Sequence, residues 1–282
     1  MTTNHLLREL APISDAAWAV IETEAKTRLT THLAARQLID FDGPHGWTHS
    51  AVNLGHVESI DGPAPGAEAR TRRVMPLVEV RYPFRVSRAA VDDAARGADD
   101  IELDELEDAA RHFGECENTT VFHGYDAAGI TGITQASSHE PIALGDDFNG
   151  YPTTVARAVN AMRIAGIGGP YGLAIGPAGY TGIIETTEHG GLLLLDHLHQ
   201  ILGGPVVWAP GVDGAVVLSL RGGDFQLVSG QDVSIGYLAH DAERVQLYLE
   251  ESFTFRVIEP DAAVVLQQRS AGVKTSKSAR KT

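Results

Sequence analysis

The sequence predicts an α+β fold. Helix-period apolar stripes and β-prone runs both occur, strands dominate the last third of the chain, and the two do not alternate in a regular βαβ rhythm. The 282 residues suffice for one elaborate domain or two compact ones, and an apolar content of 43% is enough for a sizeable core. No internal repeat is evident.

A first helix is predicted to begin after Ser14 and to continue to about Arg36. Ser14 is a favourable N-cap, and Ile13 before it can pack on Trp18 as a hydrophobic staple. Apolar residues then recur at helical spacing: Trp18, Ile21, Ala25, Leu29 and Leu33. This stripe is typical of a helix that packs on a core, and it could equally receive a peptide or a neighbouring subunit.

Proline and glycine interrupt the chain after this helix. Residues 42–47 and 61–66 have the composition of turns. Residues 74–86 alternate like a strand, but Pro76 and Pro83 weaken the pattern, so we expect an extended arm rather than a central strand. Because the backbone groups of such an arm need partners, the arm is predicted to reach over another subunit.

Three further helices are predicted, at residues 88–96, 100–118 and 154–165, and residues 192–195 have the pattern of a helix start. The first of them has Ser87 as its N-cap and Gly97 as its stop. Short β-prone runs lie between glycine turns in the second half of the chain, at residues 170–175, 206–208, 216–220, 225–228 and 244–257.

The charge is strongly negative and unevenly distributed. The chain has 37 acidic and 22 basic residues, and five of the basic residues follow Leu266, so residues 1–266 carry 17 basic against 37 acidic residues, a net charge of −20. This balance argues against binding to nucleic acid or to an anionic membrane. Residues 267–282 hold five cations, no acid and one large aliphatic residue, which predicts a disordered basic tail.

Targeting and membrane segments are not apparent in the sequence. Met1–Leu10 lacks the apolar core of a signal peptide, and the most apolar long stretch, residues 158–184, contains Arg163, two prolines and seven glycines. Cys116 is the only cysteine, which excludes an intrachain disulfide and a cysteine-based zinc site. We therefore expect a cytoplasmic protein, with Cys116 as a small buried residue on its helix.

Signatures of catalysis are weak. The glycine-rich residues 166–172 resemble a nucleotide loop, but the third glycine is out of register and a strand follows instead of a helix. The best metal candidates are acids and histidines near one another in the chain: Glu185, Glu188, His189, Asp196, His197 and His199. His197 and His199 point to different faces of a helix. We predict no metal, no cofactor and no catalytic site, which favours a structural or binding protein over an enzyme.

Six segments, taken in their order and spacing, are similar to those of encapsulins, the shell proteins of bacterial nanocompartments. They are residues 8–14 leading to Trp18, 42–47, 168–171, 221–225, 230–237 and 251–257. The resemblance covers Leu6 to Leu266 and is greatest to the linocin-type actinobacterial members. It implies the HK97 phage-capsid-like fold, with a peripheral domain, an axial domain and an extended loop.

The resemblance also implies a division of the chain. Residues 1–50 would supply the N-terminal helix and a peripheral segment, residues 51–86 the extended loop, and residues 87–135 the peripheral helices. Residues 136–220 would form the axial domain and residues 221–266 the peripheral strands. The basic residues 267–282 extend past the usual end of the family.

By resemblance, the chain is a self-assembling shell protein without catalysis, associated with oxidative stress. Sixty copies would form a closed icosahedral shell in the cytoplasm. The shell would enclose a dye-decolorising peroxidase or a ferritin-like protein that carries a C-terminal targeting peptide. Two alternatives stay open from the residues: the major capsid protein of a prophage, and a protease or hydrolase as in older family labels.

The resemblance implies two sites. The targeting peptide would dock beside the N-terminal helix, on Leu33, Arg36, Ile39, Asp40, Phe41, Asp232 and Ile235. An apolar groove rimmed by Arg36 and two aspartates can hold an extended apolar peptide and its charges. A pore at the five-fold axis would be lined by Glu188, His189, Gly190 and Gly191.

Overall fold

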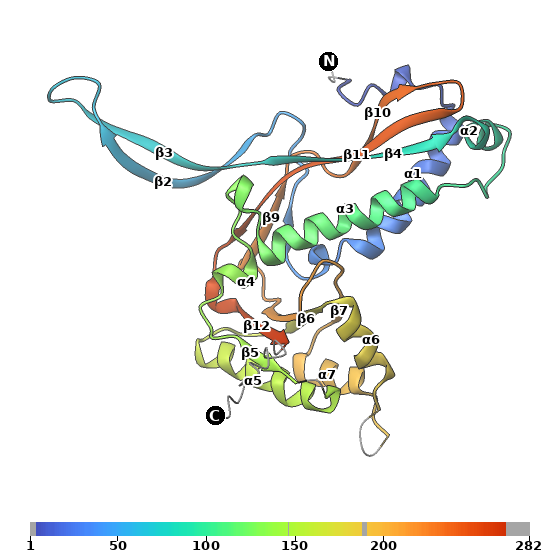
Figure 1. The fold of residues 1–282 in the computed structure, drawn as a ribbon. Helices are drawn as coiled ribbons and strands as arrows, with labels where there is room; N and C mark the ends of the chain where they lie inside the picture. Colours follow the sequence, from blue (N-terminus) through green and yellow to red (C-terminus); the bar gives the residue numbers. More distant parts are fainter. Residues whose placement is uncertain (1–3, 146, 188–190, 269–282) are drawn as a thin grey trace, which may run out of the picture.

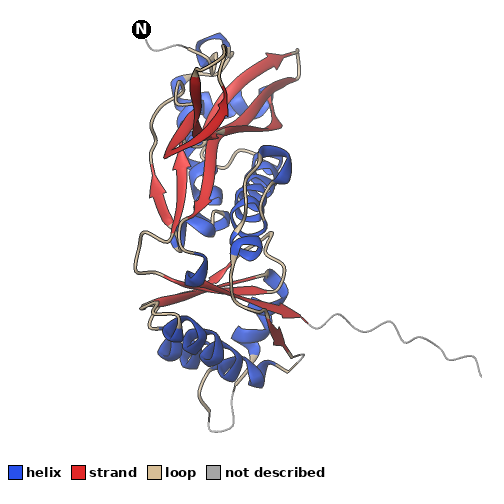
Figure 2. Ribbon diagram, turned by 90° about the vertical axis from the view of Figure 1, so that its left-hand side faces the viewer, coloured by secondary structure: helices blue, strands red, loops and turns tan. Residues whose placement is uncertain are grey.

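The computed structural model describes residues 4–145, 147–187 and 191–268. The chain forms two lobes and one long hairpin that extends away from both of them (Figure 1). Each lobe contains a five-stranded sheet with helices packed on it (Figure 2). The predicted α+β class is confirmed.

The first lobe is built around one long strand, β11 (Arg244–Val257). Strand β4 (Val78–Ser87) pairs with one edge of β11, while β10 (Ser234–His240) and β9 (Phe225–Ser229) follow one another along the other edge, and β1 (Asp40–Asp42) runs parallel to β9. Three helices pack on this sheet and complete its apolar core: α1 (Asp15–His32), α2 (Arg88–Ala95) and α3 (Asp104–His123).

The second lobe has its own sheet, in the order β5-β12-β8-β6-β7. The strands are β5 (Ile142–Leu144), β12 (Ala263–Gln268), β8 (Ala215–Ser219), β6 (Tyr171–Ile175) and β7 (Val206–Trp208). Helices α5 (Tyr151–Ile164), α6 (Pro177–Glu185) and α7 (Leu194–Leu202) gather on one side of this sheet (Figure 2). The short α4 (Ile133–Ala136) and five 3₁₀ turns connect the elements, the turns being Arg8–Leu10, Ala35–Gln37, Asp126–Ala128, Phe148–Gly150 and Pro260–Ala262.

The hairpin consists of β2 (Ala51–Asp61) and β3 (Glu68–Pro76), which pair with each other and with no other strand of the described chain. Its apolar side chains are largely in solvent: Val57, Ile60 and Val74 are 55%, 53% and 51% exposed. The hairpin enters and leaves the first lobe at one point, where Leu77 N donates to Ser50 O at 2.9 Å. We call β2, β3 and their connection the arm.

The strand predicted at residues 74–86 is divided between the arm and the first lobe. β3 ends at Pro76, and β4 begins at Val78 and joins the body sheet, so the expectation that this whole stretch is an arm was wrong for β4. Pro83 is accommodated because β4 is an edge strand, where a missing N–H can face away from the ladder.

The helices differ from the predictions mainly at their ends. Ser14 caps α1 as predicted, its Oγ accepting from Ala17 N at 3.2 Å, but the helix ends at His32 because the chain turns into the 3₁₀ segment that follows. α3 continues beyond Asn118 to His123, and Cys116 on it is exposed rather than buried. α6 was not predicted, because glycines interrupt its apolar residues.

Two features join the lobes. Asn118 is fully buried and bridges the end of α1 to the second lobe: its Oδ1 accepts from Ala35 N at 2.9 Å, and its Nδ2 donates to His32 O and Pro210 O at 2.8 and 2.9 Å. β12, which the expected division grouped with the peripheral strands, pairs with β8 and β5 in the second sheet. The range 221–266 therefore contributes to both lobes.

Candidate functional site

A groove of about 420 Å³ lies between α1 and β10 in the first lobe. Its inner surface is apolar, formed by Leu29 and Leu33 of α1, Ile235 of β10 and Leu249 of β11. Its rim is charged and contains Arg8, Glu22, Lys26, Arg36 and Asp232. The apolar stripe of α1 therefore packs on the core and also lines this groove.

The N-terminal segment of the chain closes one end of the groove. Leu6 O accepts a hydrogen bond from Tyr237 N of β10 at 2.8 Å, so this segment lies against the outer edge of the strand. The His5 ring stacks on Trp47 with a centroid separation of 3.9 Å. Arg8 pairs with Glu22 at 2.6 Å. These contacts fix residues 5–8 as a wall of the site.

Arg36 lies at the other end of the groove, in contact with three carboxylates, one each from α3, β11 and the loop before β10. Its guanidinium pairs with Glu117 of α3 at 2.6 Å, with Asp232 at 2.8 Å and with Glu251 of β11 at 2.8 Å. The side chains of Glu117 and Glu251 are fully buried. Phe41 packs on the guanidinium face, 4.8 Å from ring centroid to Cζ. Arg36 therefore neutralises buried acids as well as bordering the groove.

Glu251 has a raised pKa in this cluster. Burial raises its pKa well above the ordinary value, and the neighbouring Glu117 carboxylate raises it further, while Arg36 acts in the opposite direction. Glu251 Oε2 has no hydrogen-bond donor among the described residues, so the burial of this oxygen is uncompensated. Burial lowers the pKa of Arg36, but the carboxylates outweigh burial and raise it, so the guanidinium stays charged.

We expect Glu251→Gln to reduce the loss of stability that occurs as the pH rises above 4.5. Because the folded-state pKa of Glu251 lies above its ordinary value of 4.5, the protonated acid stabilises the fold at low pH, and this contribution is lost as the pH rises through the folded-state pKa. Within that window the wild type loses up to about 1.4 kcal/mol per pH unit, and the variant loses less. Thermal unfolding between about pH 5 and pH 9 measures the difference.

The matched control for this prediction is Glu140→Gln, which removes an exposed carboxyl on the second lobe. Its unfolding temperature should follow that of the wild type at every pH. If Glu251→Gln also follows the wild type throughout, burial does not raise the pKa of Glu251 in the folded protein and the prediction is wrong.

Four of the seven residues predicted for peptide binding meet in the groove: Leu33, Arg36, Asp232 and Ile235. The other three do not, because the chain turns away after α1 and enters β1. Ile39 and Asp40 line a separate pocket of about 170 Å³, and Phe41 contacts Arg36 from outside the groove.

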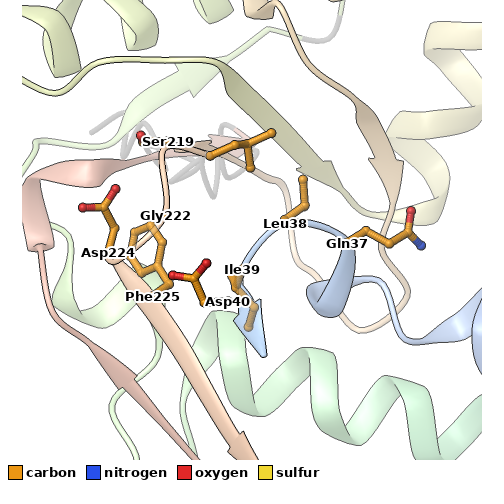
Figure 3. Close-up of a pocket in the computed structure, with 9 residues that line it drawn as sticks. Gln37, Leu38, Ile39, Asp40, Ser219, Gly222, Asp224 and Phe225 are labelled. Atoms are coloured by element: carbon orange, nitrogen blue, oxygen red, sulfur yellow. The ribbon is translucent and has the colours of Figure 1, made fainter. Parts of the chain in front are cut away.

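Figure 3 shows this second pocket, between the 3₁₀ turn after α1 and the loop before β9. Both of its carboxylates are engaged within the fold. Asp40 Oδ2 accepts from Gly223 N at 2.6 Å, and Asp224 pairs with Arg221 at 2.7 Å. These bonds hold the loop against β1, so the pocket is a structural junction.

Sequence reasoning missed Leu6, Arg8 and Lys26 as groove residues. Lys26 was detectable, since it lies on the same helical face as Thr30 and Leu33, both of which line the groove. Leu6 and Arg8 precede the helix, and their place depends on a bond to β10 more than two hundred residues later in the chain, which no local pattern reveals.

The predicted pore residues lie mainly outside the described chain. Glu188, His189 and Gly190 are not described, and Gly191 is exposed between α6 and α7 with φ +86°. Of the metal candidates, His199 contacts Gly204 O through Nδ1 at 2.9 Å. In the described ranges, histidine, cysteine and acidic side chains form no group that could hold a metal ion. No described helix is both long enough and apolar enough to cross a bilayer.

Comparison with known proteins places this chain in a family. A family model described as "Encapsulating protein for peroxidase" matches residues 3–254. The chain is 47% identical over 270 residues to a type 1 encapsulin shell protein of Rhodospirillum rubrum, covering 94% of this chain and 96% of the relative. It is 44% identical over 266 residues to a type 1 encapsulin shell protein of Rhodococcus erythropolis, covering 94% and 100%.

Solved structures share the fold at low sequence identity. A virus-like particle from Pyrococcus furiosus superimposes with a TM-score of 0.62 at 16% identity, over 89% of this chain and 99% of that chain. The capsid of an empty GTA particle gives a TM-score of 0.52 at 14% identity, over 85% and 90%. The fold is the HK97-like capsid fold, as the resemblance implied.

Proposed function

The chain belongs to the encapsulin shell proteins, and from this membership we propose that its shell encloses a peroxidase whose C-terminal peptide docks in the groove between α1 and β10. Encapsulin shell proteins form homo-oligomeric shells and are structural rather than catalytic. A shell of sixty copies in the cytoplasm is part of the proposal. The shell would supply confinement, and the enclosed enzyme would supply the chemistry.

The observation that carries the proposal is the groove itself. An apolar inner surface with charges on both rims, beside the open edge of a strand, is suited to an extended peptide of mixed apolar and charged residues. The groove is preformed, because the Arg36 cluster fixes one end and the N-terminal segment fixes the other. A preformed site limits the entropy lost when a flexible peptide binds.

The family description favours a peroxidase over a ferritin-like protein as cargo. A relative described as a ferritin-like–encapsulin shell fusion protein, from Pyrococcus furiosus, matches over only 35% of this chain. The prophage-capsid alternative has weaker support, since the capsids of the empty and native GTA particles share 14% and 15% identity with this chain, against 47% for the encapsulin of Rhodospirillum rubrum.

The test is co-expression with a dye-decolorising peroxidase from the organism that encodes this chain, with its C-terminal segment intact or deleted. Thr30 is exposed on the groove side of α1, so Thr30→Trp should fill the groove without disturbing the core. Particles of Thr30→Trp should assemble but hold at least about tenfold less haem per shell, as expected if about 1.4 kcal/mol or more of docking energy is lost.

Thr27→Trp is the matched control. Thr27 and Thr30 are both exposed on α1, and each hydroxyl donates to the carbonyl four residues earlier, but Thr27 does not line the groove. Thr27→Trp particles should load haem like the wild type. Full loading of Thr30→Trp, or loading of the peroxidase without its C-terminal segment, would contradict the docking site. Iron-rich or nucleic-acid-filled native particles would contradict a peroxidase cargo.

A further inference from the structure

On the premise of the proposed cargo function, we propose that the docked peptide binds by strand addition: it pairs with the backbone of Ile235 on the outer edge of β10 and places a carboxylate against Lys26. This goes beyond a hydrophobic groove, because it specifies the backbone conformation of the peptide and the charge that it must carry.

The free edge of β10 follows from the pairing of that strand. β10 pairs with β11 on one side, with Ile235 opposite Leu249 and Tyr237 opposite Leu247, and without a register shift between those pairs. Tyr237 N donates to Leu6 O and therefore points away from β11. In an antiparallel ladder, residues two apart direct their backbone groups to the same side, so the N–H and C=O of Ile235 also point away from β11. Ile235 itself lines the groove.

The same edge shows why the added strand must be short. Leu6 already takes the Tyr237 position at one end. At the other end Val233 N donates to Asp232 Oδ1 at 2.8 Å, and Asp232 is held by Arg36. Ile235 lies between these two closed positions. The N-terminal segment of the shell protein therefore covers the Tyr237 end of this edge as a turn, and the cargo peptide would pair beside it at Ile235.

An extended peptide at this position alternates its side chains. One set faces the apolar surface formed by Leu29, Leu33 and Leu249, and the other faces outward. Apolar residues at every second position therefore fit this groove.

Lys26 determines which charge the docked peptide must carry. Of the three cations on the rim, Arg8 pairs with Glu22 and Arg36 pairs with three carboxylates, whereas the Lys26 ammonium has no acidic partner among the described residues. It is also the only lysine outside residues 267–282, in a body with a net charge of −20. A carboxylate of the peptide, from a side chain or the chain end, would complement it.

The first experiment uses assembled shells and a synthetic peptide copied from the C-terminal segment of the peroxidase named above. Analogues carry one N-methyl amide each, which removes one backbone donor and blocks pairing. Because Ile235 is the open position on this edge, methylation of the one peptide amide that donates to Ile235 O should weaken binding about tenfold, and methylation of the amides on either side should change it by less than about twofold. The Ile235 amide should gain protection from hydrogen exchange only when the unmodified peptide is added.

The outcomes distinguish a failure of the proposed docking function from a failure of strand addition. If the unmodified peptide does not bind, the proposed docking function fails. If it binds and no single N-methyl position weakens binding more than its neighbours do, docking occurs without strand addition and the inference of strand pairing is overturned. If the Ile235 amide is already protected in empty shells, a second copy of this chain occupies the edge, and the inference is again overturned.

The second experiment tests the charge. Lys26→Gln should weaken peptide binding about fivefold and reduce its dependence on salt. Arg28→Gln is the control, because Arg28 lies on the other side of α1 and pairs with Glu24 and Glu107. The acidic groups of the peptide are also replaced by amides, one at a time. For the peptide that lacks the carboxylate facing Lys26, Lys26→Gln should no longer weaken binding. Equal losses for every peptide would show that Lys26 does not pair with the peptide.

Discussion

Arg36→Ala is expected to destabilise the subunit by about 3–5 kcal/mol, because it leaves buried carboxylates without their counter-charge. Glu117 and Glu251 are fully buried, and both contact the Arg36 guanidinium. The unfolding temperature should fall by roughly 6 °C or more. Differential scanning calorimetry of the purified variant measures this change.

A second variant tests whether the stability lost in Arg36→Ala comes from the buried acids. Arg36→Ala combined with Glu117→Gln removes the cation and one buried charge together, so it should recover part of the stability that Arg36→Ala loses. Arg36→Ala with an unfolding temperature within about 1 °C of the wild type would show that the cluster is unimportant for folding. Loss of cargo in any Arg36 variant reports on the fold as well as on the peptide, which is why the Thr30 and Thr27 pair is the better test of docking.

Removing the arm is expected to abolish assembly while leaving the two lobes folded. Ser50 and Leu77 are joined by a backbone hydrogen bond of 2.9 Å, so residues 51–76 can be replaced by an Asn-Gly turn between them. A solitary two-stranded hairpin is marginally stable in water, and the exposed apolar side chains of the arm have no cover within the subunit. The arm therefore needs a neighbouring subunit.

Size-exclusion chromatography and negative-stain microscopy distinguish the outcomes. The arm-deleted chain should elute as a free subunit, and its circular dichroism should retain the helix and strand signals of the lobes. Particles of normal size from the arm-deleted chain would show that the arm is dispensable for the shell. An unfolded product would show that the arm stabilises the subunit itself.

Much of the fold was predictable from local patterns. The N-cap at Ser14, the alternation along β11 and three strands of the second lobe (β6, β7 and β8) depend on neighbours in sequence, and they were found within a few residues. β5 and β12 of the second lobe were not predicted. The prediction missed α6, because glycines obscured its period, and the end of α3, because Asn118 is a polar residue buried inside a helix rather than a stop.

The candidate site was only half predictable. Leu33 followed from the helical stripe, and Arg36, Asp232 and Ile235 followed from the family resemblance. The buried acids that hold Arg36 were missed, because Glu117 and Glu251 are 81 and 215 residues away in the chain. Charged residues in a strand or helix are ordinarily assigned to the solvent face, and only the long-range pairing reverses that assignment.

The arm also has a consequence for the turnover of the protein in the cell. A subunit that has not met its neighbours would keep β3 exposed, and β3 carries three arginines, at positions 70, 72 and 73, that trypsin-like proteases can cleave. Once a neighbour covers the arm, those bonds are protected. Orphan subunits would then be degraded while completed shells persist, so the abundance of the protein would follow the number of finished shells rather than the rate of synthesis.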